Sequence, residues 1–260
     1  MTDLNTLDMK DVNGRSAADI SGRGEVALWF VSLQQPSSTI EAAAAILSAE
    51  EMQRAGQFRF PLHRNRFVLA HAALRHILCM CSGCSASGID FTISSHGKPS
   101  LTDSSRGNRA KIEFNLSHSE DLAVIAVSFG SILGVDVEQV REMPDWPQMA
   151  RRFFSDAETA AIERAPSVEA SKMFLRFWTR KEALLKAIGT GLQDDLSCFC
   201  TVANGLDQAS IVQVPKLPGV DGNGEYERGF TLRSFEFEGF VGALAVDGPV
   251  SSIRRLQWVW

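Results

Sequence analysis

The sequence predicts an α+β protein built from two halves, each with a long helix packed on a small, mainly antiparallel sheet. Strand-like segments occur in runs joined by short turns, which is typical of antiparallel sheets rather than of alternating parallel units. Two long segments, 61–81 and 167–188, carry apolar residues at helical spacing. The order strand, long helix, several strands occurs twice along the chain, without a clear sequence repeat.

The first half is predicted to span 25–131, after a loose N-terminal tail. Residues 1–24 are rich in Asp, Asn, Ser and Gly and lack periodicity, as unstructured segments do. Val26–Leu33 is an apolar strand, and two short helices follow, one opened by a capping-box-like start at Ser38 and one beginning at Ser48. After the long helix, this half contains strand candidates at Phe91–Ile93, Ile112–Leu116 and Ala123–Phe129.

The second half is predicted to span 132–260. It begins with a strand, Leu133–Glu138, and continues through a helical segment, Trp146–Glu163, to the longest helix, Ser167–Ile188, which stops at Gly189. The remaining strand candidates are Phe199–Val202, Ser210–Val214, Phe230–Glu236, Phe240–Val246 and Leu256–Trp260. The strand Leu133–Glu138, which carries the acids Asp136 and Glu138, therefore lies at the junction of the halves. Such a junction is a common position for a ligand cleft.

Composition and charge exclude several classes of function. The 260 residues are 45% hydrophobic and 22% charged, in the ordinary range of soluble globular proteins. A net charge of -5 argues against a broad basic surface for nucleic acid. The N-terminus has no signal-peptide pattern, and the longest uncharged apolar stretch, 122–135, is too short to span a membrane. We expect a soluble cytoplasmic protein without nucleic-acid or membrane partners.

The five cysteines have two interpretations. Cys81-x-x-Cys84 together with Cys198-x-Cys200 could form a zinc site. The odd number of cysteines, the position of Cys79 in an apolar helix end and the one-residue spacing of the second pair favour reduced, partly buried thiols.

Asp136 and Glu138 occupy alternate positions of the strand and share one face. Acids at such positions are commonly a solvated outer face. Here the strand is otherwise apolar, and carboxylates in a buried strand need a partner or a metal. Oxygen ligands of this kind select Mg²⁺ or Mn²⁺, with phosphate oxygens and waters as further ligands.

Glu182 and Lys186 are four residues apart on the long helix and lie on one face. The simplest interpretation is a surface helix with routine ion pairing. The helix is apolar over much of its circumference, however, which leaves a cleft as the place for Lys181, Glu182 and Lys186. Three acids and a lysine suit a divalent cation that holds a phosphate, with a base and an acid beside it.

The segment Asn115–Ser119 ends a strand and is either a polar turn or an anion site in which a hydroxyl and an imidazole bind phosphate. A serine-hydrolase pair of Ser117 and His118 is excluded, because neighbours in a strand point to opposite faces. The segment 54–66 is basic, and solvent-exposed charges on a helix are enough to explain it. Lys98, in the turn Gly97-Lys98-Pro99, carries no information by itself. The basic residues are Arg54, Arg59, Arg64 and Arg66.

Taken in order, five motifs closely resemble the phosphopantetheinyl transferases, in particular the larger type that activates surfactin synthetase and other carrier-protein systems. The resemblance runs from Arg54 to Leu192, and each motif alone is weakly specific. The motifs are His96-Gly-Lys-Pro99, Asn115-Leu-Ser-His-Ser119, Gly134-Val-Asp-Val-Glu138, Phe153-Phe-Ser-x-x-Glu158 and Trp178-Thr-Arg-Lys-Glu-Ala-Leu-Leu-Lys-Ala-Ile-Gly-Thr-Gly-Leu192.

The resemblance implies two halves related by a pseudo-twofold axis, with coenzyme A bound between them. It assigns Mg²⁺ on the pyrophosphate to Asp136, Glu138 and Glu182, and assigns the pyrophosphate contact and protonation of the leaving group to Lys186. The remaining coenzyme A residues are Lys98 and Pro99 beside the adenine, and Ser117, His118, Arg66 and Arg54 on the phosphates, chiefly the 3′-phosphate. Two departures affect the 3′-phosphate contacts: His63 stands where the family often has Asp, and His71 where it often has Arg.

The implied activity is transfer of 4′-phosphopantetheine from coenzyme A to a serine of an apo acyl, polyketide or peptidyl carrier protein, by a monomer. The basic-apolar segment 143–154 suits docking of the carrier, although core packing of Phe153 and Phe154 explains it equally well. Two alternatives are a coenzyme A and carrier-protein binding module without turnover, and a Mg²⁺-dependent phosphohydrolase.

Overall fold

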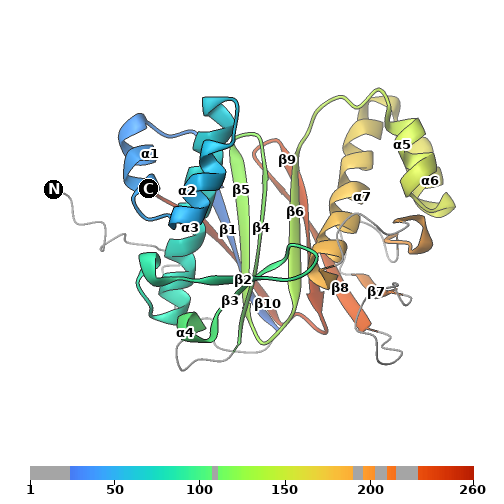
Figure 1. Cartoon of the computed structure of the whole chain (residues 1–260). Coiled ribbons are helices and arrows are strands. Elements are labelled where there is room, and N and C mark those ends of the chain that lie inside the picture. The colour runs from blue at the N-terminus through green and yellow to red at the C-terminus, as the bar shows by residue number, and fades with distance from the viewer. Residues whose placement is uncertain (1–23, 107–110, 190–195, 203–209, 215–227) are drawn as a thin grey trace. The chain divides into compact units, whose positions relative to one another are not determined.

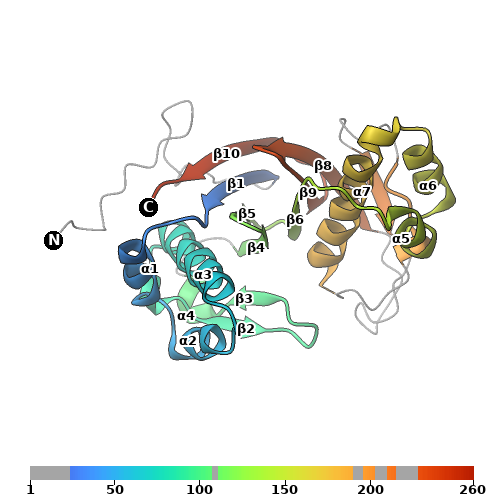
Figure 2. The ribbon, with the colours of Figure 1, turned by 90° about the horizontal axis from the view of Figure 1, so that it is seen from above.

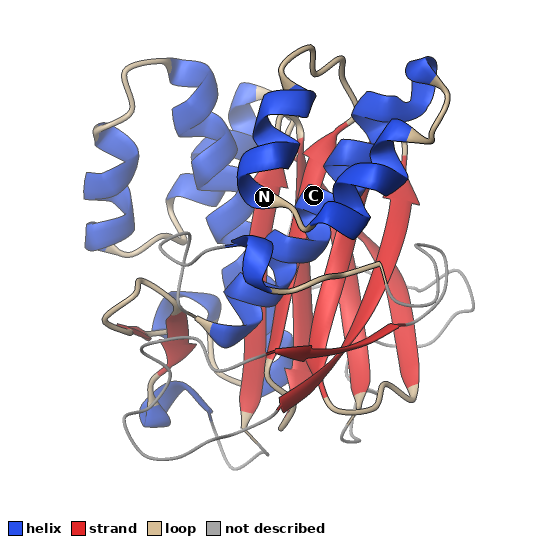
Figure 3. Ribbon diagram, turned by 90° about the vertical axis from the view of Figure 1, so that its right-hand side faces the viewer, coloured by secondary structure: helices blue, strands red, loops and turns tan. Residues whose placement is uncertain are grey.

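The computed structural model describes residues 24–106, 111–189, 196–202, 210–214 and 228–260. These residues form both helices and mainly antiparallel strands (Figure 3), which confirms the α+β class. The contacts divide the chain into two compact units. Unit 1 comprises Met1–Thr92, Pro99–Gly130 and Ser252–Trp260, and unit 2 comprises Ile93–Lys98 and Ser131–Ser251. The predicted loose tail, 1–24, lies outside the described residues except for Gly24.

Unit 1 is built on a four-stranded sheet in the order β10-β1-β5-β4. Strand β5 is antiparallel to both neighbours, whereas β10 runs parallel to β1. All eight residues of β5 are buried, because it is an inner strand and its sequence is almost entirely apolar. The bounds are β1 Glu25–Ser32, β4 Ile112–Ser119, β5 Leu122–Phe129 and β10 Ser252–Trp258.

The long helix α3, Pro61–Ser82, lies beside this sheet (Figure 2) and shares one apolar core with it. Proline at its first position suits a helix start, and Gly83 ends the helix with φ of 80°. Helix α2, Ala49–Gly56, begins with a complete capping box between Ser48 and Glu51. The smaller elements are α1 Ser37–Ala44, η2 Ala86–Gly88, β2 Phe91–Ile93, β3 Pro99–Leu101 and α4 Asp103–Arg106.

Unit 2 is built on an antiparallel sheet in the order β6-β9-β8-β7, with the long helix α7 packed along it (Figure 1). The acidic strand β6 is an edge strand of this sheet and contacts α7 directly. The strands are β6 Leu133–Gln139, β7 Ser210–Val214, β8 Arg228–Phe237 and β9 Phe240–Asp247. The helices are α5 Trp146–Phe153, α6 Asp156–Glu163, α7 Ser167–Ile188 and the short η3 Leu196–Cys198.

The predicted helical segment Trp146–Glu163 is confirmed, and it is divided into two helices because Ser155 and Glu158 form a capping box that starts a new helix. Two other local predictions are wrong. Residues Phe199–Val202 are not a strand, since polar side chains of α6 and α7 bind their main chain instead. Helix α1 has no side-chain cap, so the capping box expected at Ser38 is absent.

The two units differ from the predicted halves, 25–131 and 132–260, in two segments: Ile93–Lys98 lies in unit 2, and the last strand lies in unit 1. Strand β10 pairs with β1 from Glu25↔Ser252 to Val31↔Trp258, and therefore belongs to unit 1. Trp258 packs edge-on against Trp29 of β1. This long-range pairing has no local sequence signal.

Cys81 lies in the apolar core of unit 1. Among the described residues, Cys79, Cys81, Cys84 and Cys200 form no disulfide. Within the described ranges, none of the helices combines the length and apolar character that crossing a membrane demands.

Candidate active site

Strand β6 and helix α7 pack backbone against backbone at Gly134. A Cβ atom at this position would overlap the Ala183 carbonyl oxygen and the Ala187 amide nitrogen, and would lie 2.8 Å from the Lys186 carbonyl carbon. Only glycine permits so close an approach of strand and helix. Because alternate residues of a strand share a face, Asp136 and Glu138 face α7 together with Gly134.

Gly134→Ala is therefore expected to destabilise the protein and to force α7 away from β6. The overlapping atoms belong to the helix backbone, so a side-chain rotation cannot relieve the overlap, and we expect a cost of about 1–3 kcal/mol or more. The measurements are the midpoint of urea unfolding and the turnover per folded molecule. Gly56→Ala in α2 is the control, because its Cβ would meet no atom within 4 Å. Equal midpoints for the two variants would contradict the close packing.

Asp136 and Lys186 form an ion pair at this contact. Lys186 Nζ donates to Asp136 Oδ1 over 2.7 Å. The Asp136 side chain is 7% exposed and that of Lys186 is 30% exposed. The ammonium is thus held against β6 while part of the side chain stays open to solvent.

Glu182 precedes Lys186 by one helical turn and faces the same acids. Its Oε1 atom is buried and has no hydrogen-bond partner among the described residues. Burial and the negative charges of Asp136 and Glu138 raise the pKa of Glu182 to about 7, against the opposing effect of Lys186. A carboxylate with a pKa near neutrality can accept a proton at physiological pH and release it again.

Asp136, Glu138 and Glu182 are the three carboxylates that the sequence predicts as ligands of a divalent cation. As their side chains stand, no group of three or more His, Cys, Asp or Glu residues in the described part of the chain is arranged so that it could hold a metal ion. Lys186 Nζ donates to Asp136 Oδ1, and Arg141 Nη1 donates to Glu138 Oε2 over 3.1 Å. A cation among these oxygens would give the buried Glu182 oxygen a partner and relieve the repulsion that raises its pKa. Their chemistry suits Mg²⁺ or Mn²⁺.

Without a divalent cation, Glu182 should make the protein less stable as the pH rises. The folded pKa of about 7 lies above the ordinary value of 4.5, so between these values the folded protein keeps a proton that the unfolded chain releases. The stabilising contribution is fully present below the unfolded pKa and is lost as the pH rises through about 7.

In EDTA we therefore expect Glu182→Gln to melt a few degrees above the wild type at about pH 8, with little difference at about pH 5. Added Mg²⁺ should raise the Tm of the wild type more than that of the variant. Thermal scans across this pH range test both points. Identical melting temperatures in EDTA at every pH would show that Glu182 is not buried among like charges.

Lys98 lies in unit 2, in the turn that precedes β3. Its Nζ donates to the main-chain oxygens of Leu133, over 3.1 Å, and Ala187, over 2.8 Å. These carbonyls belong to the first residue of β6 and the last turn of α7. Pro99 is the first residue of β3 and is partly buried. The sequence shows no signal for these two bonds.

In unit 1, strand β4 separates the two polar residues predicted to bind phosphate. Ser117 is 6% exposed, whereas its neighbour His118 is exposed. Because consecutive side chains of a strand point to opposite faces, a phosphate on one face of β4 is within reach of only one of them. The same arrangement agrees with the exclusion of a serine-hydrolase pair.

The basic residues predicted to bind phosphate have protein partners. Arg66 is 8% exposed and donates to Asp121 Oδ1 over 3.0 Å, and its Nη2 lies 2.9 Å from Glu120 Oε2. The Arg54 guanidinium is exposed and lies 5.5 Å from the centre of the Phe67 ring.

His71, one of the two departures from the family pattern, has a side-chain partner, Glu51. Its Nδ1 lies 3.1 Å from Glu51 Oε1, and Arg75 Nε donates to Oε2 over 2.7 Å. Burial by itself would raise the pKa of Glu51, but the hydrogen bonds from His71 and Ser48 and the charge of Arg75 outweigh it and lower this pKa to about 2. The other departure, His63, packs edge-on against Phe60.

Lys181 does not lie in a cleft with Glu182 and Lys186, so that prediction is wrong. Its side chain is fully buried, with Nζ 2.9 Å from Glu158 Oε2 and bonded to the Phe199 carbonyl over 2.7 Å. One step along an α-helix turns the side chain by about 100°, so Lys181 and Glu182 face different surroundings. Glu158 also accepts from the amide and hydroxyl of Thr201. Lys181 therefore ties α7 to α6 and to segment 196–201.

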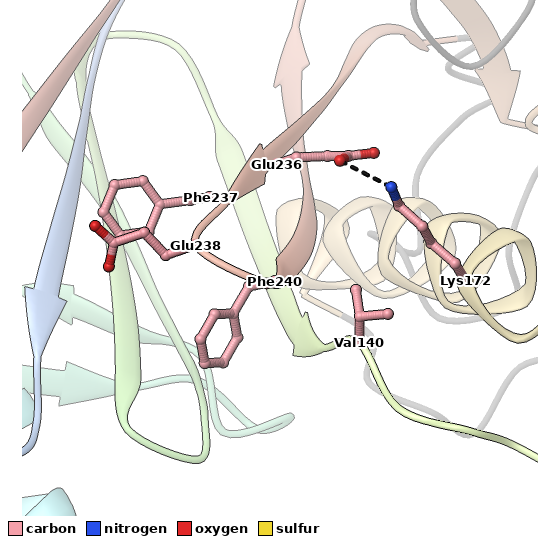
Figure 4. A pocket seen from close by; sticks show the side chains of 7 residues that line it. Val140, Lys172, Glu236, Phe237, Glu238 and Phe240 are labelled. Atoms are coloured by element: carbon pink, nitrogen blue, oxygen red, sulfur yellow. Dashed lines mark hydrogen bonds and ion pairs between the residues drawn. The ribbon is translucent and has the colours of Figure 1, made fainter. Parts of the chain in front are cut away.

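A pocket of about 310 Å³ lies at the β8–β9 turn, and none of the predicted site residues lines it. Lys172 and Glu236 point toward each other in Figure 4 and form a 2.9 Å ion pair. The other lining residues are Val140, Phe237, Glu238, Gly239 and Phe240.

Sequence patterns assigned no role to Gly134 or Arg141. A glycine inside an apolar strand is a signal for close backbone approach, and it stands two residues before the first acid. Arg141 has no comparable signal, because it lies after the strand and its pairing with Glu138 depends on the chain's path there.

Two family models match this chain, and several curated relatives are similar to it. Residues 132–226 match the model described as the 4′-phosphopantetheinyl transferase superfamily, and residues 34–130 match that of the N-terminal part of 4′-phosphopantetheinyl transferases. The 4′-phosphopantetheinyl transferase HetI of Nostoc sp. is 41% identical over 168 residues, which cover 65% of this chain and 70% of HetI.

Two further relatives are more distant. The 4′-phosphopantetheinyl transferase Sfp of Bacillus subtilis is 26% identical over 171 residues, 66% of this chain and 73% of Sfp. The human L-aminoadipate-semialdehyde dehydrogenase-phosphopantetheinyl transferase is 27% identical over 219 residues, 81% of this chain and 70% of the human protein. The chain belongs to the 4′-phosphopantetheinyl transferase superfamily. Within it the chain is of the Sfp-like type, which confirms the resemblance seen in the sequence.

Proposed function

We propose that this protein transfers the 4′-phosphopantetheine group of coenzyme A to a serine hydroxyl of an apo carrier protein and releases adenosine 3′,5′-bisphosphate. Membership of the superfamily supports the transfer, and the acidic face between β6 and α7 supports its mechanism. The single observation that carries the mechanism is the Glu182 carboxylate, whose buried Oε1 atom has no hydrogen-bond partner among the described residues, beside the Asp136–Lys186 pair.

Asp136, Glu138 and Glu182 are the proposed ligands of Mg²⁺, with Mn²⁺ as a possible substitute. When bound, the ion supplies positive charge to the pyrophosphate oxygens of coenzyme A. The side chains prepare for it by their placement: Asp136 and Glu138 project from one face of β6, and Gly134 lets α7 bring Glu182 to that face.

Glu182 is the proposed base. A serine hydroxyl is a weak nucleophile and must lose its proton as it attacks the phosphorus, to Glu182 directly or through a water. The serine oxygen forms its bond to the phosphorus that carries pantetheine, and the bond from that phosphorus to the bridging oxygen breaks.

Lys186 is the proposed acid. Negative charge develops on the bridging oxygen as adenosine 3′,5′-bisphosphate departs, and an ammonium can stabilise that charge and donate a proton. The ion pair with Asp136 holds the Lys186 ammonium in place before the substrate arrives. Its side chain therefore needs little reorganisation during the reaction.

The remaining coenzyme A contacts are proposed from the resemblance. They are Lys98 and Pro99 beside the adenine, and Arg54, Arg66, Ser117 and His118 on the phosphates. His118 is the more accessible of the two β4 residues. Arg66 would have to exchange Glu120 or Asp121 for phosphate, because both acids contact it.

The proposed partner is an apo carrier protein of acyl, polyketide or peptidyl type. In segment 143–154, Phe154 is buried in the core and Phe153 packs on Trp178, whereas Arg151 and Arg152 are exposed. Docking of an acidic carrier through this segment would therefore rest on the arginines more than on the phenylalanines.

The decisive experiment incubates the protein with coenzyme A, Mg²⁺ and a panel of apo carriers, read by intact mass. The expected result is a gain of one phosphopantetheine group by at least one carrier, and its loss in EDTA. A binding module would leave every carrier mass unchanged. A phosphohydrolase would release adenosine 3′,5′-bisphosphate without carrier, so the bisphosphate is measured in both reactions.

We also propose that the protein acts as a cytoplasmic monomer that binds neither nucleic acid nor membrane. The net charge of -5 is consistent with this proposal. Sedimentation equilibrium at working concentration tests the monomer, and a dimer mass would contradict it.

A further inference from the structure

The turn before β3 holds Lys98 in a defined backbone position. The Ser94 amide donates to the Lys98 carbonyl over 3.0 Å, and the Lys98 amide donates to Ser94 Oγ over 3.0 Å. Gly97 adopts φ of 84°, in the left-handed region that glycine tolerates. The side chain therefore leaves a closed turn rather than a loose loop.

The ammonium of Lys98 bonds to both elements that carry the proposed catalytic residues, strand β6 and helix α7. Its acceptor Leu133 lies three residues before Asp136, and its acceptor Ala187 is the residue after Lys186. The side chain also passes Gly189, where an added Cβ would lie 3.3 Å from Lys98 Cδ. Lys98 thus bonds to the main chain of β6 near Asp136 and to the main chain of α7 next to Lys186, the proposed general acid.

The Ala187 carbonyl belongs to the last turn of α7, where carbonyls have no partner within the helix. The helix ends at Ile188, and the amide of the next residue, Gly189, donates to the Leu185 carbonyl. A cation at this end satisfies the carbonyl and interacts favourably with the helix dipole.

We propose that Lys98 is a positioning residue, which fixes the C-terminal turn of α7 against the start of β6 and so holds Lys186 and Glu182 opposite Asp136. This role rests on the proposed function only for its effect on turnover. It adds to the adenine contact implied by the resemblance, which would affect binding of coenzyme A alone.

The test compares Lys98→Met with two other variants. Methionine retains much of the side-chain length but removes the donors. Lys172→Met is the matched control, because Lys172 pairs with Glu236 away from the acid site and the charge lost is the same. Lys98→Arg retains a cation and its donors, and keeps the test usable if Lys98→Met does not fold.

Hydrogen exchange of peptides covering 133–138 and 184–189 is measured first, without coenzyme A or carrier. In Lys98→Met we expect these amides to exchange about tenfold faster or more. Local opening of these segments then no longer has to break the two hydrogen bonds that Lys98 makes to Leu133 and Ala187. Lys172→Met should leave them unchanged, and Lys98→Arg should lie closer to the wild type. Wild-type exchange in Lys98→Met would overturn the proposal, as would a disturbance that Lys172→Met reproduces.

Steady-state transfer is measured second. A positioning role predicts that Lys98→Met lowers kcat about 10- to 100-fold with little change in KM for coenzyme A, and that Lys98→Arg recovers part of it. A raised KM with unchanged kcat would leave only the adenine contact and overturn the positioning role. If the wild type transfers nothing, the proposed function fails, while hydrogen exchange still decides the role of Lys98.

Discussion

Glu182→Gln should lower the rate of phosphopantetheine transfer by about 10²–10⁴-fold while the protein stays folded. The substitution keeps the size of the side chain but removes the group that accepts the serine proton, and general bases commonly contribute this much. It also removes a proposed Mg²⁺ ligand. Folding is not at risk, because a neutral amide avoids the cost of a carboxylate buried beside Asp136 and Glu138. The measurement is turnover with saturating coenzyme A and apo carrier.

Glu169→Gln is the matched control, since it makes the same change in the exposed first turn of the same helix. It should retain wild-type turnover. Asp136→Ala should lose transfer as Glu182→Gln does, because it removes both a proposed ligand and the partner of Lys186. Turnover near the wild-type rate in either site variant would refute the mechanism.

Lys181→Met should have the largest effect on stability, about 3–5 kcal/mol. Breaking a buried ion pair from one side leaves the other charge buried and uncompensated, and here both side chains are 0% exposed. The carbonyl of Phe199 also loses a donor. Urea unfolding measures the change in free energy, and turnover is normalised to the folded fraction.

Lys172→Met is the comparison, because its ion pair with Glu236 is exposed and such pairs contribute about 1 kcal/mol or less. The double variant Glu158→Leu with Lys181→Met should recover part of the loss, since neither charge of this ion pair is then left buried without its partner. If Lys181→Met lost turnover while keeping wild-type stability, Lys181 would belong to the active site, as its position in the motif first suggested.

Local sequence patterns were sufficient for much of this protein. The two long helices, the acidic strand β6 and the start of a short helix at Ser48 follow from side-chain periodicity and start signals, which act over a few residues. The same local rules place Asp136 with Glu138, and Glu182 with Lys186, because alternation in a strand and the helical turn need no distant partner.

Tertiary packing decided what those patterns left open. Whether the strand acids meet the helix depends on Gly134, which admits the α7 backbone. The rotation of α7 then places Lys181 in the core with Glu158 and Lys186 beside Asp136, although both lysines belong to one motif. Strand β10 likewise pairs with a strand more than two hundred residues away in sequence. Such contacts depend on which surfaces fit together in space, and periodicity along the chain carries no record of that fit.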